Sequence, residues 1–209
     1  MISALMKTIL YYGGRAPPIY NTKGELCVDI VYISGSPRDN SNTDYLLNLA
    51  LSITDGQFVK LTDYRIEPCK SCWACQKLDR CVIDDDMSNI LITMLLEADG
   101  VVLGSPVYFN NVSGQVKVFM DRTWCIRGRL KDKIGGGVVV GRGYGLESAL
   151  TAIHAFMIKH EMILGHRGVS GRAYEKGEII KDKRAIEDTK ELAKRLSELC
   201  RLKNLGAVC

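Results

Sequence analysis

The sequence predicts a single α/β domain whose parallel β-sheet is covered by helices on both faces. Two observations support this prediction. Five short apolar segments rich in β-branched residues alternate with segments in which apolar residues recur at helical spacing, as in repeated βαβ units. The 209 residues, 46% of them hydrophobic, are enough for one domain with a sizeable core and rather few for two.

The expected elements follow one another from residue 25 to the end of the chain. Strands are expected over residues 26–34, 57–64, 99–108, 133–143 and 162–169, and helices over residues 44–53, 85–98, 113–124, 146–161 and 182–203. The first strand, "LCVDIVYIS", is short, apolar and β-branched, which is typical of a strand buried on both faces. The breaker sequences "GGRAPP" and "NTKG" indicate that residues 1–24 form an N-terminal extension before a single domain over residues 25–209.

Charge and hydropathy exclude several classes of partner. The formal net charge is +4, and the densest basic segment, "KDKRAIEDTKELAKR" at 181–195, alternates in sign. We therefore interpret it as a solvated helix face and expect no nucleic-acid partner. No window approaches the roughly 18 consecutive apolar residues of a membrane-spanning helix. The N-terminal residues lack a long apolar region with a cleavage site, so we expect no signal peptide and a cytoplasmic location.

The loop after the first expected strand, "SGSPRDNSNT" at 34–43, is a candidate phosphate site. Ligands of open α/β sheets bind at the carboxyl ends of the strands, and phosphate is held there by hydroxyl, amide and cationic donors. The candidate donors are Ser36, Arg38, Ser41, Asn42 and Thr43. The loop lacks the Gly-Lys-Ser/Thr ending of nucleotide-triphosphate sites and the G-x-G-x-x-G pattern of dinucleotide sites. An ordinary polar loop with Asn42 or Thr43 as the helix N-cap is the alternative.

The loops after the third and fourth expected strands contain residues that suit a flat ring. In "GSPVYFNNVSGQVKVFMDR" at 104–122, Tyr108 and Phe109 could flank such a ring, and Asn110 could hydrogen-bond to its polar edge. The alternative is that the aromatic pair belongs to the core. In "GRGYGLES" at 141–148, three glycines in five positions permit positive φ and a close approach of the backbone, although a flexible turn explains them too.

Together these loops resemble the flavodoxin-like NAD(P)H-dependent FMN reductase superfamily over about residues 26–170. The resemblance implies a flavodoxin-like three-layer sandwich with strand order 2-1-3-4-5 and FMN as a cofactor. It assigns the FMN phosphate to the five donors of the first loop. It assigns the ring to Pro106, Val107, Tyr108, Phe109, Asn110, Ser113, Gly143 and Tyr144. Asp121 and Arg122 also match, but adjacent residues of a helix do not share a face, so we expect a structural or interface role for them.

Four cysteines lie within "CKSCWACQKLDRC", with the spacing C-x2-C-x2-C-x5-C, after the second expected strand. A disulfide framework is disfavoured in a reducing compartment. Structural zinc sites usually join two separated ligand pairs, whereas three thiols here follow at short intervals, which suits a cluster whose irons each need one thiolate. The x5 gap and Val82 depart from the bacterial ferredoxin pattern. A zinc site and a metal-free segment remain the alternatives.

The wider segment "EPCKSCWACQKLDRCVIDDDM" resembles the archaeal-type iron–sulfur flavoproteins, a branch of the same superfamily. The resemblance implies one [4Fe–4S] cluster held within residues 67–86, as an electron port beside the flavin. The implied ligands are Cys69, Cys72, Cys75 and Cys81. Trp73 could shield the cluster or simply pack. The remaining cysteines, among them Cys125 and Cys200, and the three histidines are expected not to be ligands.

These cofactors predict a function in redox chemistry. FMN exchanges one or two electrons and the cluster exchanges one. The expected function is therefore electron transfer between a ferredoxin-like one-electron donor and a two-electron acceptor. Arg38, Arg127 and Arg142 are candidates to stabilise the reduced ring. The resemblance further implies a homodimer or a dimer of dimers. The alternatives are an NAD(P)H-dependent FMN or quinone-type reductase without a cluster, and a zinc-stabilised, flavin-free binding protein.

Overall fold

The computed structural model describes residues 28–206. The expected N-terminal extension, residues 1–24, lies outside the described residues. The strands are β1 (Ile30–Ser34), β2 (Gly56–Lys60), β3 (Gly100–Pro106), β4 (Ile134–Gly141), β5 (Ile163–Leu164) and β6 (Val169–Arg172). The helices are α1 (Asn42–Leu51), α2 (Cys75–Leu78), α3 (Ile92–Glu97), α4 (Gly114–Arg122), α5 (Leu146–Lys159) and α6 (Lys183–Asn204). Short 3-10 helices cover Leu61–Asp63, Thr123–Ile126 and Glu178–Lys181, and a π-helix over Met87–Leu91 leads into α3.

The sheet has the order β2-β1-β3-β4-β5, and the neighbouring strands are parallel. This confirms the predicted flavodoxin-like fold and strand order. The single fifth strand predicted over residues 162–169 is wrong in detail. Two strands occupy that position: β5 pairs with the start of β4, and β6 pairs with its end. Gly168, with φ of +93°, turns the chain between them, which an extended strand could not do.

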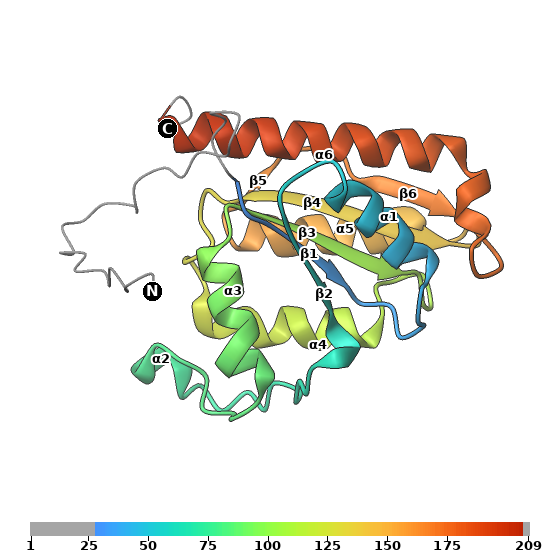
Figure 1. The fold of residues 1–209 in the computed structure, drawn as a ribbon. Coiled ribbons are helices and arrows are strands. Elements are labelled where there is room, and N and C mark those ends of the chain that lie inside the picture. The colour runs from blue at the N-terminus through green and yellow to red at the C-terminus, as the bar shows by residue number, and fades with distance from the viewer. Residues whose placement is uncertain (1–27, 207–209) are drawn as a thin grey trace, which may run out of the picture.

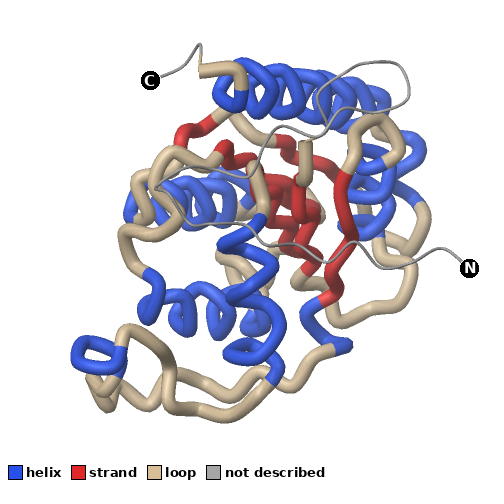
Figure 2. The backbone as a smooth tube through the Cα atoms, turned by 60° about the vertical axis from the view of Figure 1, so that its left-hand side comes forward, coloured by secondary structure: helices blue, strands red, loops and turns tan. Residues whose placement is uncertain are grey.

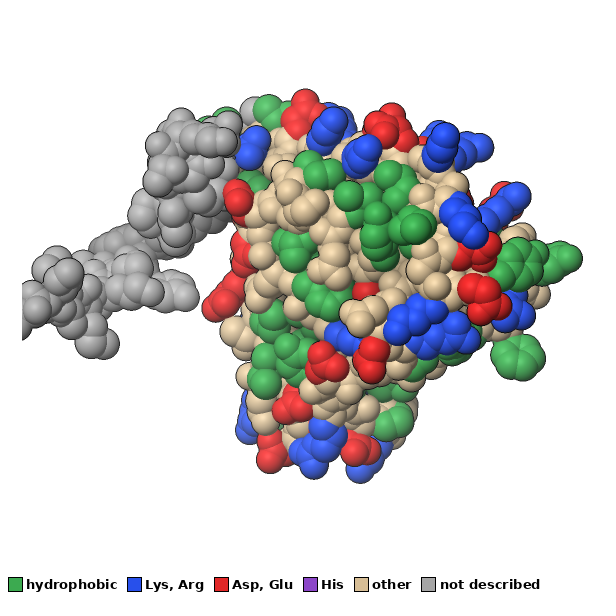
Figure 3. Space-filling model, turned by 45° about the vertical axis from the view of Figure 1, so that its right-hand side comes forward, with side chains coloured by type: hydrophobic (Ala, Val, Ile, Leu, Met, Phe, Trp, Pro, Cys, Tyr) green, Lys and Arg blue, Asp and Glu red, His purple; other side chains and the backbone are tan. Residues whose placement is uncertain are grey.

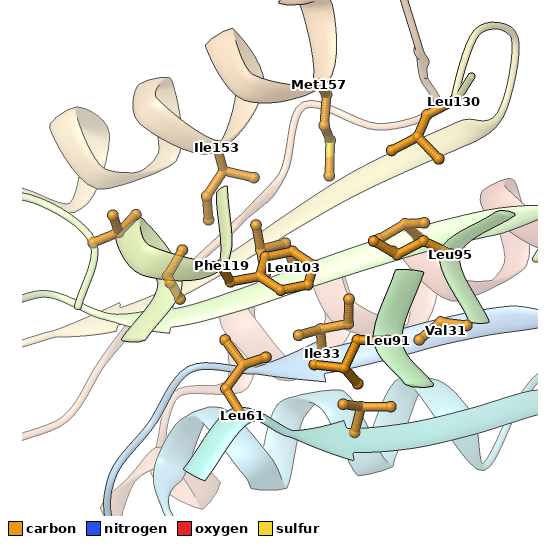
Figure 4. Close-up of a cluster of buried hydrophobic side chains, with 14 of the residues drawn as sticks. Val31, Ile33, Leu61, Leu91, Leu95, Leu103, Phe119, Leu130, Ile153 and Met157 are labelled. Carbon is orange, nitrogen blue, oxygen red and sulfur yellow. The ribbon is translucent and has the colours of Figure 1, made fainter. Parts of the chain in front are cut away.

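Helices cover both faces of the sheet (Figures 1 and 2). Side chains of successive strand residues point to opposite faces, so each strand contributes to two cores. Val31 and Ile33 of β1 face the core beneath α3, α4 and α5, where Phe119 and Ile153 pack (Figure 4). The intervening Tyr32 belongs to the second core, beneath α1 and α6. The result is a three-layer sandwich.

The glycine run of β4 lets the two helical layers approach the sheet closely. A Cβ at Gly136 would lie 3.0 Å from Leu196 of α6, and one at Gly137 would lie 2.7 Å from Leu150 of α5. Side chains at these positions would push the helices away from the sheet. The glycines therefore position the amino end of α5, and with it the third candidate loop.

Helix α6 confirms the interpretation of the sign-alternating segment. Its buried stripe faces the sheet, and its exposed face carries ion pairs such as Lys190–Glu187 and Arg195–Glu198. Basic and acidic side chains alternate along the upper edge of the molecule, where α6 lies (Figure 3). None of the described helices is long and apolar enough to cross a membrane.

Candidate functional site

A cavity of about 140 Å³ opens at the carboxyl ends of the central strands, and we call it the strand-end cavity. All five predicted phosphate donors line it, together with three of the predicted ring residues, Pro106, Val107 and Tyr108. Sequence reasoning missed Tyr174 and Lys176, which come from the loop after β6 and line the same cavity. Their position depends on the pairing of β6 with β4, which no local pattern in the sequence reveals.

Residues 34–43, which we call the phosphate loop, are held from behind by a buried ion pair. Lys60 at the end of β2 lies 2.7 Å from the carboxylate of Asp44 in α1, and both side chains are less than one-tenth exposed. Lys60 also donates a hydrogen bond to the Arg38 carbonyl at 2.6 Å. Asp44 accepts hydrogen bonds from the Ser34 hydroxyl and the Ser41 N–H. The loop therefore has a fixed backbone before any ligand arrives.

The N-cap of α1 differs from the alternative considered from the sequence. Ser41, and not Asn42 or Thr43, caps the helix, because its hydroxyl accepts from the Asp44 N–H while Asp44 accepts from the Ser41 N–H. This reciprocal arrangement is a capping box, and the Ser-x-x-Asp spacing could have revealed it. The amide of Asn42 bonds instead to Glu175 and Gly177, and it ties the loop after β6 to the phosphate loop.

The other predicted ring residues lie outside the lining of the strand-end cavity. Phe109 and Asn110 both have positive φ, 47° and 58°, and Phe109 is fully exposed. Ser113 is fully buried, caps α4 and donates to the Gly35 carbonyl at 2.6 Å, so it joins two loops. Gly143 and Tyr144 are on the third loop beside the cavity, where Tyr144 is exposed. Their roles toward a flavin remain predictions.

The third candidate loop, residues 141–148, approaches the second, residues 104–122, at a position that requires glycine. Gly145 has φ of +67°, and a Cβ there would lie 2.4 Å from the Asn110 Cα. The predicted close approach of backbone therefore occurs between these two loops.

Positive charge surrounds the strand-end cavity. Arg38, Arg142 and Lys176 line it, and the Arg142 guanidinium lies 5.8 Å from the ring of Tyr174. These cations and the hydroxyl donors suit an anionic phosphate. Arg127, the third candidate for the reduced ring, is not among the residues that line this cavity: its guanidinium lies 5.3 Å from the ring of Trp124. Its role toward a reduced ring stays a prediction.

The four cysteines of residues 67–86, the cysteine segment, line a second cavity of about 670 Å³, which we call the cysteine cavity. All four are free thiols; Cys69 and Cys72 are exposed, and Cys75 and Cys81 are half-buried. The opposite wall is formed by the carboxyl-terminal ends of α4 and α5 and is mainly apolar. Trp73 stands edge-on to Trp124 at 6.2 Å but is still 54% exposed.

The donor set and the backbone of the cysteine segment fit an iron–sulfur cluster. Ser71, Trp73 and Asp79 all have positive φ, between 51° and 60°, a conformation that costs a non-glycine residue about 1–3 kcal/mol and is concentrated at functional sites. Successive N–H groups in such turns can form concave anion sites, which many iron–sulfur centres use. In residues 28–206 no three His, Cys, Asp or Glu side chains are arranged around a single ion. A cluster makes no such demand, because its thiolates bind different irons.

Arg122 of α4 joins the cysteine segment to the body of the protein. Its side chain and that of Asp85 are fully buried, and the guanidinium binds both carboxylate oxygens, at 2.5 and 2.9 Å. Burial by itself would raise the pKa of Asp85, but hydrogen bonds from Arg122 and from the N–H groups of Glu67 and Ser88 outweigh it and hold that pKa below its usual value. The expectation of a structural Arg122 agrees with this placement, whereas Asp85 was missed.

A fifth thiol and a histidine also line the cysteine cavity. Cys125 is buried, which raises its pKa to about 11, and it donates to the Arg122 carbonyl. His160 bonds to Thr123 at 2.9 Å, and burial lowers its pKa. Cys125 is thus a neutral thiol in this arrangement. The expectation that neither residue is a ligand remains a prediction.

The two cavities lie at opposite ends of α4. The helix begins beside Ser113, next to the phosphate loop, and ends at Arg122 in the cysteine cavity. Nine residues of α-helix span about 13 Å. The cysteine segment runs back along this helix after β2, so its thiols lie at the far end of α4 from the phosphate loop.

A flavodoxin-like sandwich with a phosphate-type loop at its strand ends defines a flavin redox protein of the flavodoxin-like class. The particular family follows from comparison with known sequences. Residues 28–173 match the NADPH-dependent FMN reductase family, and the chain belongs to that family.

Relatives of known name agree with this assignment. The chain is 37% identical over 189 residues to an iron–sulfur flavoprotein of Methanocaldococcus jannaschii, which covers 83% of the chain and 97% of that protein. It is 38% identical over 147 residues to the iron–sulfur flavoprotein of Methanosarcina thermophila, covering 65% of the chain and 75% of that protein. The predicted resemblance to iron–sulfur flavoproteins is confirmed, and the comparisons support FMN and an iron–sulfur cluster as cofactors.

Solved structures share the fold. RosB with a bound intermediate has a TM-score of 0.68 at 16% identity, covering 87% of this chain and 84% of that one. The Trp repressor binding protein from Bacillus subtilis has a TM-score of 0.62 at 19% identity, covering 78% and 97%. Identities this low establish the fold alone.

Proposed function

We propose that this chain binds FMN in the strand-end cavity and one [4Fe–4S] cluster at Cys69, Cys72, Cys75 and Cys81. It would transfer electrons between a ferredoxin-like one-electron carrier and a two-electron acceptor. The observation that carries the proposal is the presence of two separate sites in one domain: an anion site at the carboxyl ends of the strands, and four free thiols around one cavity at the carboxyl end of α4. When bound, FMN supplies one- and two-electron chemistry and the cluster supplies one-electron chemistry.

The residues of the phosphate loop have defined roles in this proposal. Arg38 of this loop and Lys176 of the loop after β6 would neutralise the phosphate, and the amino-terminal N–H groups of α1 would donate to it. Asp44, close behind the loop, would repel an anion if its charge were uncompensated. Lys60 cancels that charge at 2.7 Å, so the loop stays attractive to phosphate.

Partners follow from charge and from the family resemblance. The formal net charge of +4 suits docking to an acidic carrier protein through electrostatic steering. A homodimer or a dimer of dimers is part of the proposal, and it would bring cavities of different copies together.

Anaerobic purification followed by iron, sulfide and flavin assays tests the proposal. We expect one FMN per chain, equal amounts of iron and sulfide, and visible absorption from both groups. The change Cys72→Ala should lower the iron content, whereas Cys200→Ala, the same change on the other face of the sheet, should leave it unchanged. A colourless protein with zinc and without iron or flavin would overturn the proposal.

A second candidate is an NAD(P)H-dependent reductase that needs no cluster. One relative favours it: a putative NAD(P)H-dependent FMN-containing oxidoreductase of Bacillus subtilis is 28% identical over 178 residues, covering 79% of this chain and 97% of that protein. Mixing the flavin-loaded Cys72→Ala variant with NADPH separates the candidates. Reduction of its flavin as fast as in the wild type supports the second candidate, and dependence on the cluster supports the first.

A further inference from the structure

We propose that Arg122 is the positioning residue of the cysteine segment: it closes the segment into a loop and fixes Cys81, the thiol that follows the long x5 gap. The inference rests on the proposed function, since it concerns how the protein holds the cluster. It assigns to Arg122 a specific role beyond the general structural one expected from the sequence.

The first step is the closure of the loop. The cysteine segment begins at Glu67, and Arg122 donates a hydrogen bond to the carbonyl of Glu67 at 2.6 Å. Near the end of the segment, Arg122 donates to both carboxylate oxygens of Asp85. Asp85 in turn accepts from the Glu67 N–H at 2.9 Å. Next to them, Arg65 and Asp86 exchange two hydrogen bonds. One guanidinium therefore binds both ends of the loop that carries all four cysteines, and we call these contacts the loop base.

The second step is the contact with Cys81. The Arg122 Nη2 lies 3.5 Å from the Cys81 Sγ and 3.0 Å from the Ser88 hydroxyl. Cys69, two positions after Glu67, and Cys72 are by contrast exposed. Cys81 thus has a defined position before a cluster forms, and the x5 gap is spanned from a fixed point.

The third step is an unused donor. Among the described residues, Arg122 Nε is buried without a hydrogen-bond partner, although the residue lines the cysteine cavity. A buried donor without a partner is unfavourable, so this N–H is suited to a sulfur acceptor that fills the cavity. Because Asp85 neutralises the charge of Arg122, Arg122 would act on the cluster sulfurs mainly through directional hydrogen bonds. Hydrogen bonds to cluster sulfurs raise the reduction potential, because they stabilise the more negative reduced form.

The test compares Arg122→Lys with Arg195→Lys, the same change at an exposed ion pair on α6. In iron-free protein, hydrogen exchange at residues 67–88 should become about tenfold faster or more in Arg122→Lys, while exchange in α6 stays unchanged. In protein loaded with iron and sulfide, transfer of iron to a chelator should rise by about 10–100-fold, the usual effect of removing a residue that supports a metal ligand. The midpoint potential of the cluster should become more negative. Arg195→Lys should change none of these.

A second variant, Asp85→Asn, keeps Arg122 and a side chain of almost the same shape at position 85. It tests the same inference if Arg122→Lys does not fold. It should loosen the same amides and release iron faster. Wild-type protein that cannot hold iron would overturn the proposed function and this inference together. An iron-containing wild type with both variants unchanged in exchange, iron release and potential would overturn this inference alone.

Discussion

The phosphate loop and the cysteine segment are both held by a buried ion pair, yet they are prepared for their ligands to different degrees. Lys60 and Asp44 lie directly behind the phosphate loop and fix its backbone, so the cavity in front of it is already formed. Arg122 and Asp85 lie at the loop base of the cysteine segment, and beyond it two of the four thiols are exposed.

The difference reflects the two kinds of ligand. A phosphate is bound by donors that already point toward it. A rigid loop therefore loses little conformational entropy when the phosphate binds. A metal centre couples its own binding energy to the folding of the ligands around it. The fold alone therefore forms the phosphate site, whereas the cysteine site would be completed only when the cluster binds.

The largest effect should come from Arg122→Met, which leaves Asp85 as an unpaired buried charge. Removing one partner of a buried pair costs about 3–5 kcal/mol of stability. Urea denaturation of the iron-free protein measures this loss. The exposed pair Arg195–Glu198 is the control, and Arg195→Met should cost less than about 1 kcal/mol. Equal losses of stability in the two variants would show that the Arg122–Asp85 pair contributes no more than an exposed ion pair.

Lys60→Met should weaken the binding of FMN and leave the cysteine segment unaffected. The change leaves the Asp44 carboxylate uncompensated behind the phosphate loop, where it repels the phosphate, so FMN affinity should fall about 10–100-fold. Riboflavin, which lacks the phosphate, should bind with nearly unchanged affinity, and iron content should stay at the wild-type level. Fluorescence titration with both flavins measures the difference, with Lys190→Met as the exposed control. A parallel loss of riboflavin binding would show that Lys60 supports the whole cavity and not the phosphate.

Acid should act on the cysteine segment through Asp85. Its pKa is lowered in the folded protein, so its contribution to stability is full above the unfolded value of about 3.9 and is lost as the pH falls through the folded value. The slope for one such group is at most about 1.4 kcal/mol per pH unit. Urea midpoints measured between about pH 6 and pH 3 should fall less steeply for Asp85→Asn than for the wild type. Identical slopes would mean that Asp85 does not couple the segment to pH.

The smallest effect should come from Ser41→Ala, which removes the N-cap of α1. Loss of such a cap costs about 1 kcal/mol. Thermal unfolding measures the loss, and the matched change Ser52→Ala, at the exposed other end of α1, should cost less. FMN binding by Ser41→Ala should also weaken, because Ser41 lines the strand-end cavity among the proposed phosphate donors, and an unchanged FMN affinity would remove Ser41 from that set.

The sequence predicted the fold because its signals are local. Strand and helix segments, the phosphate loop and the cysteine spacing are each visible within about twenty residues. The two ion pairs are not: Lys60 lies 16 positions from Asp44, and Arg122 lies 37 positions from Asp85. Neither pair follows a helical or strand period, and only the folded chain brings its members together. The same reason explains the missed Tyr174 and Lys176.

The division of the last strand position into β5 and β6 affects how copies of this chain can meet. An unbroken edge strand offers a continuous row of free N–H and C=O groups, onto which a strand from another molecule can be added. Here that edge consists of a two-residue and a four-residue strand separated by a turn at Gly168. Such a short, interrupted edge is a poor template for fibril growth, so the fold protects this side of the sheet against aggregation.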